Sequence, residues 1–249
     1  MRYRILIFDL LSSTNDYIKD LAESGAPEGT VIIAWEQTAG KGRLGRSWAS
    51  PRGGAWFSVL LRPPILPERA GCISILIAVS LARAIREHWG VPVGVKWPND
   101  LYVQYAKLGG ILIELSCRSE KIAWLVAGIG VNVNNELPKE TRVPATSLAR
   151  ELGRAVPLEE FFDVALTALA HDYERFLAEG FGFVQARWSE LSILRPGCAW
   201  TVCQPQTGEA HAQCEVLGLA ESGRLIVRMG EKIWELTAEE VTLCPPQPS

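Results

Sequence analysis

"VGVKWPNDLYVQYAKLGGILIELSCRSEKIAWLVAGIGVNV" (residues 93–133) contains four short apolar runs in close succession. The runs at 93–97, 100–103, 108–117 and 122–133 are rich in apolar and β-branched residues, a composition typical of strands. Only short turns separate them, whereas parallel strands need crossover connections of a dozen or more residues. The segment therefore predicts an antiparallel or mixed sheet.

The sequence on either side of this segment supplies further strands and the helices. More strands are predicted at 4–10, 30–37 and 55–62. Ser13 and its polar neighbours are N-cap residues, so a first helix is expected from there to about Glu23. The other predicted helices lie at about 68–89, 145–152 and 158–178. The predicted fold class is α+β, a mixed sheet with helices on one face.

The pattern changes near Arg195-Pro196-Gly197, which indicates a second module. Short strands "AWTVCQ", "AQCEVLGL", "RLIVRM" and "KIWELT" follow at the spacing of a small β-barrel or sandwich of about 50 residues. A boundary between 192 and 195 gives two predicted domains, 1–192 and 193–249.

Composition indicates an ordinary folded protein with no general attraction for polyanions. Hydrophobic residues make up 48% of the 249 residues and charged residues 21%; the net charge is −3 and the sequence pI about 5.8. The longest apolar stretch, 72–85, is too short to span a bilayer and predicts a buried helix. The N-terminus lacks a convincing signal-peptide pattern. A cytoplasmic location is predicted.

The cysteines and histidines give no sign of a metal site. The six cysteines contain no C-x-x-C pair and lie mostly in apolar segments, which predicts buried, reduced thiols. The three histidines lie far apart in sequence, with no carboxylate or cysteine at ligand spacing, so a zinc site has no support.

"GKGRLG" (40–45) has the G-x-G-x-x-G spacing of a dinucleotide-binding turn. Such a turn needs a strand before it, a helix directly after it and an acidic residue about 20 positions on. The strand at 30–37 meets the first condition, but Pro51 and two glycines oppose a helix, and Glu68 does not close a second strand. A backbone phosphate cradle also has no need of the cations in this stretch, Lys41, Arg43 and Arg46. The stretch predicts instead a mobile cationic loop that wraps an anion.

Four polar islands interrupt otherwise apolar segments. They are Ser13-Thr14-Asn15, Gln37 with the loop 40–46, "KWPND" (96–100), and Lys107-Leu108-Gly109-Gly110. Three of these islands also have a purely structural explanation that needs no ligand. Helix capping would explain the first, turn propensity the third, and a solvated strand edge the fourth. Paired glycines beside Lys107, however, indicate close approach of another group to the backbone. Asn132 alternates with valines and adds a polar group to one strand face.

Five motifs, "STN", "EQTAGKGRLGRSW", "VKWPNDLY", "KLGGILIEL" and "GIGVNVN", occur in an order and spacing that resembles bacterial biotin protein ligases. The resemblance covers about residues 8–150 and, more weakly, the C-terminal module. It is to the monofunctional form, without an N-terminal DNA-binding domain. It implies a catalytic domain related to class II aminoacyl-tRNA synthetases, followed by a small SH3-like β-barrel.

The resemblance also implies a reaction and its partners. Biotin and ATP give biotinyl-5′-AMP and pyrophosphate, and a lysine of a biotin carboxyl carrier domain, such as that of acetyl-CoA carboxylase, then accepts the biotinyl group. Mg²⁺ is the expected metal ion. Neither operator DNA nor a membrane is an expected partner. The sequence leaves open whether the chain forms a homodimer.

Site residues follow from the resemblance, and their chemistry suits the reaction. A carboxylate that attacks an α-phosphate must be held in line with it while both charges are neutralised. Lys107 and Arg43 are the expected catalytic residues, and Asp100 is the expected metal ligand. Lys41 stands where the family usually has Arg, and a lysine offers a point charge instead of a planar fork. The resemblance places biotin against Ser13, Thr14, Asn15, Gln37, Gly40, Lys41, Gly42, Arg43, Lys107, Gly109 and Gly110. It places ATP and its phosphates against Arg43, Arg46, Trp48, Asn99, Asp100, Lys107 and Asn132.

Two alternatives remain. A lipoate or octanoate ligase shares the fold and the acyl-adenylate chemistry, and differs in its acyl pocket. A non-enzymatic nucleic-acid module would use the basic loop to bind phosphates, but the acidic pI opposes it.

Overall fold

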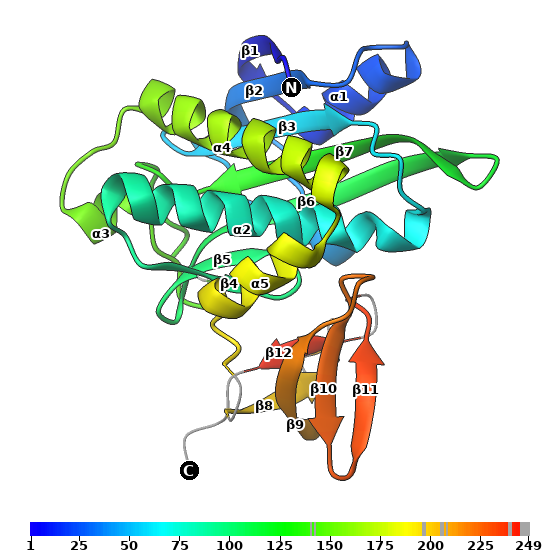
Figure 1. The fold of residues 1–249 in the computed structure, drawn as a ribbon. Coiled ribbons are helices and arrows are strands. Elements are labelled where there is room, and N and C mark those ends of the chain that lie inside the picture. The colour runs from blue at the N-terminus through cyan, green and yellow to red at the C-terminus, as the bar shows by residue number, and fades with distance from the viewer. Residues whose placement is uncertain are drawn as a thin grey trace.

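A seven-stranded mixed sheet forms the larger part of the fold (Figure 1). The computed structural model describes residues 1–139, 141, 143–195, 198–204, 207, 209–238 and 241–244. The strands lie in the order β1-β2-β3-β7-β6-β5-β4; β1 and β2 are parallel and the other neighbours are antiparallel. The predicted mixed sheet is confirmed. Its strands are β1 (Arg4–Leu11), β2 (Thr30–Gln37), β3 (Ala55–Leu61), β4 (Val93–Lys96), β5 (Asp100–Val103), β6 (Ala106–Arg118) and β7 (Lys121–Val131).

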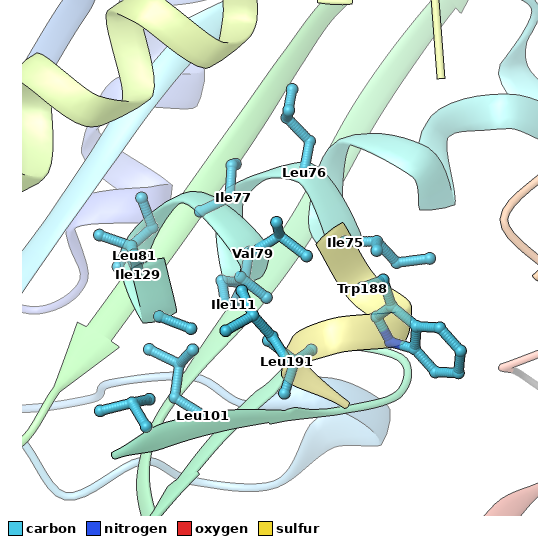
Figure 2. Packing of buried hydrophobic residues seen from close by; sticks show 14 of the residues in the cluster. Ile75, Leu76, Ile77, Val79, Leu81, Leu101, Ile111, Ile129, Trp188 and Leu191 are labelled. Carbon is cyan, nitrogen blue, oxygen red and sulfur yellow. The ribbon is translucent and has the colours of Figure 1, made fainter. Parts of the chain in front are cut away.

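Three helices, α2 (Ala70–Trp89), α4 (Leu158–Glu179) and α5 (Gly182–Leu191), pack on one face of this sheet (Figure 1). Most of α2 is buried, as its apolar sequence predicts, and Gly90 at φ 71° ends it in a left-handed cap. Figure 2 shows side chains of α2, Ile77 among them, clustered with Ile111 of β6 and Leu191 of α5. No helix in the described ranges is long and apolar enough to cross a membrane. The short helix α3 (Leu148–Leu152) precedes α4.

Helix α1 (Thr14–Glu23) covers the opposite face, so the prediction of helices on one face is wrong. Its Ile18 and Ala22 pack against Ile32 of β2 and Leu60 of β3. These alternate along their strands with residues that face α2, and successive strand residues point to opposite faces. The unbroken apolar run at the centre of β2 is typical of a strand buried on both sides. That run was the signal in the sequence that helices would cover both faces of the sheet.

A second, five-stranded antiparallel sheet follows, in the order β11-β10-β9-β8-β12. It agrees with the predicted α+β fold with a small second β unit, although β12 was not foreseen. The two predicted domain ranges, 1–192 and 193–249, remain a prediction. The strands are β8 (Ala199–Cys203), β9 (Ala210–Leu219), β10 (Leu225–Met229), β11 (Lys232–Leu236) and β12 (Thr242–Cys244).

Several hydrogen bonds join the second unit to the first, among them those of Trp97 and Gln185. Trp97 Nε1 donates to the carbonyl of Gly223 (3.0 Å), and Gln185 Nε2 donates to the carbonyl of Leu219 (2.8 Å). Trp97 belongs to the turn between β4 and β5. The second sheet is therefore held beside the edge of the first where the "KWPND" motif lies.

All six cysteines are free thiols. Cys72, Cys203 and Cys214 are buried, as predicted, and burial raises the pKa of Cys72 to about 11. Cys117 and Cys198 are exposed, so the prediction of buried thiols is wrong for these two. Cys117 lies near the end of β6, where the last two residues of the strand are exposed.

Candidate functional site

A cavity of about 460 Å³ opens on the α1 face of the large sheet, above β6 and β7. Its floor has few side chains, because the strand register pairs Gly110 with Gly130 and Leu112 with Gly128. Residues two apart on a strand share a face, so all four lie on the same side. The walls come from the glycine loop, the β4–β5 turn and the segment after β7, and Ala238 and Val241 of the second unit also contribute.

The floor glycines make room for other site residues. A Cβ at Gly128 would lie 2.1 Å from Oδ1 of Asn15, and a Cβ at Gly130 would lie 2.7 Å from Nε1 of Trp48. Both distances are far below van der Waals contact, so any side chain there would displace Asn15 or Trp48. Neither glycine was among the predicted site residues. Their spacing of two residues in "GIG" was the available sign that both glycines lie on the same face of the strand and leave space there.

Hydroxyls and amides form the neutral end of the cavity. Gln37 Oε1 accepts from the backbone N of Thr14 (2.8 Å) and lies 3.1 Å from the Thr14 hydroxyl. The Ser58 hydroxyl lies 2.7 Å from Oγ1 of Thr14 and 2.6 Å from Oδ1 of Asn15. Ser13 caps α1, so the capping interpretation is confirmed; Ser13 also lines the cavity, and its contact with biotin stays a prediction. Ser58 was missed because it is one polar residue inside an apolar strand.

The glycine loop folds into a small hydrogen-bonded hairpin. The backbone N of Gly42 donates to Arg46 O (2.7 Å), and that of Trp48 donates to Gly40 O (2.8 Å). Leu44 at φ 57° and the following Gly45 at φ 71° are both left-handed, a conformation that strains leucine. No helix follows the loop, which agrees with the rejection of a dinucleotide-binding turn. Mobility without ligand stays a prediction.

The loop cations contact partners inside the protein. Lys41 Nζ lies 2.7 Å from Oδ2 of Asp16 in α1. Arg43 Nη1 donates to Oδ1 of Asn99 (3.2 Å), and its Nη2 donates to the carbonyl of Ala238. Arg43 therefore links the loop to the "KWPND" turn and to the second unit.

Lys107 lies at the charged end of the cavity. Its Nζ pairs with Oδ1 of Asp100 at 2.7 Å and stands 5.2 Å from the ring centre of Trp48. Lys96 lines the same region, and burial lowers its pKa although the nearby Asp100 opposes that shift. Lys96 belongs to the "KWPND" motif but was not among the predicted site residues. Among the lining residues that the structure describes, Asp100 is the one carboxylate, and the cations are Lys41, Arg43, Arg46, Lys96 and Lys107.

All predicted site residues except Gly40 and Gly109 line this one cavity. A Cβ at Gly40 would lie 2.4 Å from the carbonyl of Trp48, and one at Gly109 would lie 2.6 Å from the carbonyl of Gly130. Close packing of neighbouring backbone explains these two glycines. The described residues contain no group of three or more His, Cys, Asp or Glu side chains that could hold a metal ion.

Residues 7–132 match the biotin/lipoate A/B protein ligase family. The chain belongs to this family. It is 31% identical to the bifunctional ligase/repressor BirA of Bacillus subtilis, over 98% of this chain and 75% of that protein. It is also 31% identical to the biotin–[acetyl-CoA-carboxylase] ligase of Paracoccus denitrificans, over 87% of this chain and 90% of that one.

Solved structures of this family share the fold along nearly the whole chain. The biotin protein ligase from Aquifex aeolicus in complex with biotin and ATP superposes with a TM-score of 0.83 at 28% identity. The match covers 98% of this chain and 99% of that one, so it includes both sheets.

Proposed function

We propose that the chain is an ATP-dependent biotin–protein ligase. The biotin carboxylate attacks the α-phosphate of ATP, which forms biotinyl-5′-AMP and releases pyrophosphate. The ε-amine of a lysine on a biotin carboxyl carrier domain then attacks the acyl carbonyl and AMP leaves. The observation that carries the proposal is a single cavity with a neutral hydrogen-bonding end and a strongly cationic end.

The neutral end suits the ureido head of biotin. Thr14, Asn15 and Gln37 present hydroxyl and amide groups that can exchange hydrogen bonds with its N–H and C=O groups. Lipoate and octanoate offer no such partners, so these buried polar groups would lose hydrogen bonds on binding them. This mismatch favours biotin over the other acyl groups that the family handles. The side chains assigned to this end are Ser13, Thr14, Asn15 and Gln37, beside the backbone of Lys41 and Gly42.

The cationic end suits the carboxylate and the phosphates. Lys107 and Arg43 would hold the attacking carboxylate and the α-phosphate, and Arg46 and Lys96 would add charge for the remaining phosphates. Fixed positive charge is the main requirement, because two anions must approach each other. No His or Cys is among the described residues that line the cavity, and the proposed direct attack requires no covalent enzyme nucleophile.

Mg²⁺ fits the donor set in the way it commonly accompanies a nucleotide. Mg²⁺ at such sites is usually held by one or two carboxylates together with substrate phosphates and water. Asp100 is the carboxylate that the described lining offers, and Asn99 and Asn132 lie in the same lining. The ion would neutralise charge on the phosphates.

Pyrophosphate release tests the proposal. Purified protein with ATP and Mg²⁺ should release pyrophosphate with biotin and far less with lipoate or octanoate. A carrier domain added afterwards should gain the mass of one biotinyl group. Equal release with all three acids would refute the biotin assignment, and release with octanoate alone would identify the alternative ligase. Biotin-independent binding to DNA without pyrophosphate release would favour the nucleic-acid module.

A further inference from the structure

Glu114 is a carboxylate that does not line the cavity but contacts Asn15, which does. It lies on β6, on the α1 face, and its side chain is about a third exposed. Its two oxygens have different partners in α1. Oε2 accepts from Nδ2 of Asn15 at 2.7 Å, and Oε1 accepts from Nζ of Lys19 at 2.7 Å.

Asn15 is held from both ends of its amide. Its side chain is buried, with Oδ1 2.6 Å from the Ser58 hydroxyl and Nδ2 on Glu114. An amide turned by 180° would place Oδ1 against the carboxylate, where two acceptors repel each other. The Ser58 hydroxyl can donate or accept, so it permits either orientation. Glu114 therefore decides which way the amide of Asn15 points.

Lys19 keeps Glu114 in place. Its Nζ also lies 2.9 Å from Asp16 Oδ1, so the ammonium bridges two carboxylates. Burial alone would lower the pKa of Lys19, but its hydrogen bonds to Glu114 and Asp16 raise it overall. Lys19 is therefore charged at neutral pH, and the negative charge of Glu114 is compensated where it lies.

We infer that Glu114 is a positioning residue for biotin recognition, and that it acts by fixing the amide of Asn15. Within the described chain, Glu114 is the acceptor assigned to Nδ2, and an amide nitrogen carries two hydrogens. The second N–H is left to donate to an acceptor in the cavity, such as a ureido oxygen. The inference rests on the proposed function, because it assigns Asn15 to the biotin head.

Glu114→Gln is the sharpest test, since it is nearly isosteric but offers both a donor and an acceptor to Asn15. The Lys19 ammonium can only donate, so it should take the amide oxygen of the glutamine and leave Nε2 facing Asn15, which favours the turned amide. In the biotin-dependent release of pyrophosphate, we expect KM for biotin to rise about tenfold, the effect of one lost hydrogen bond. KM for ATP should change less than twofold. Calorimetric titration with biotin alone should show the same loss of affinity.

Glu23→Gln is the matched control. Glu23 also joins α1 to the sheet through a carboxylate, which accepts from Nε1 of Trp124 (2.6 Å) and pairs with Arg118. It does not contact Asn15, so KM for biotin should stay within twofold of wild type. A comparable rise in Glu23→Gln would mean that any weakening of α1 has this effect, and would overturn the inference.

A double-variant cycle tests the route through Asn15. If Glu114 acts only by orienting that amide, adding Glu114→Gln to Asn15→Ala should change KM for biotin by less than twofold. Additive effects would overturn the inference, as would an unchanged KM for biotin in Glu114→Gln alone. Wild-type protein that releases no pyrophosphate with biotin would instead refute the proposed function, so the two failures are distinguishable.

Discussion

Replacing Lys107 with methionine should nearly abolish adenylate formation while the fold persists. Methionine keeps most of the length of the side chain and removes the charge together with the N–H donors of the ammonium. Two unit charges about 4 Å apart at an effective dielectric constant of about 20 interact by about 4 kcal/mol. Lys107 already lies 2.7 Å from an anionic oxygen, so a substrate carboxylate or phosphate can reach a similar distance. Removing such a contact from a developing anion typically costs roughly 2.7–4 kcal/mol, or about 10²–10³-fold in rate.

The assay is biotin-dependent pyrophosphate release, together with a thermal melt. The Lys107 side chain is about a quarter exposed, and partly solvated ion pairs contribute only about 0–1 kcal/mol to stability. The melting temperature should therefore fall by only a few degrees. Lys107→Arg, which retains the charge, should keep more activity than Lys107→Met. An adenylation rate within threefold of wild type in Lys107→Met would refute the catalytic assignment.

Three further predictions concern the loop, the core and the metal. Biotin with ATP should strongly protect the segment 38–47 from trypsin and ATP alone should protect it little, because closure requires the adenylate; equal cleavage with and without biotin would contradict the lid. Burial alone would raise the pKa of Asp172, but hydrogen bonds from Ser80 and Arg187 hold this pKa below its usual value. The carboxylate therefore stabilises the fold at neutral pH, and this stabilisation is lost as the pH falls through the lowered pKa. Asp172→Asn should thus cost roughly 3 kcal/mol at pH 7, a fall of about 6–12 °C in Tm that shrinks in acid, and an unchanged Tm would count against it. Asp100→Asn should raise the Mg²⁺ concentration for half-maximal pyrophosphate release several-fold, and an identical Mg²⁺ titration would remove Asp100 as a ligand.

Most of the fold could be predicted because its elements have strong local patterns. The strand runs 93–97 and 100–103 and the helix at 72–85 are each visible in the sequence as a short run of apolar residues. Helix α5 was missed because it begins at Gly182 and buries only three residues. The side of the sheet that α1 covers was missed because the local pattern of a helix does not say which face of a sheet it meets.

The residues of the candidate site could be predicted where their motifs lie at strand ends and turns. They were harder to predict where strand pairing and the packing of distant elements decide which residues meet. Polar islands far apart in sequence meet in one cavity, since each lies at a strand end or a strand-to-helix junction. Gly128 gains its role only from the approach of Asn15, and Ala238 only from the docking of the second sheet. Glu114 looked like an ordinary polar residue on a strand, because its partners lie about a hundred positions away.

Two lysine–aspartate ion pairs of the site, Lys41–Asp16 and Lys107–Asp100, should respond differently to a substrate anion. Asp16 contacts both Lys41 (2.7 Å) and Lys19 (2.9 Å), so it keeps a cation when Lys41 turns to a ligand. Asp100 pairs with Lys107, and moving that ammonium to the substrate leaves a carboxylate facing the phosphates of ATP. Such a carboxylate opposes binding unless another cation reaches it. The Mg²⁺ proposed to accompany ATP would meet this requirement, which would give an acidic residue a use in a cavity that must otherwise attract anions.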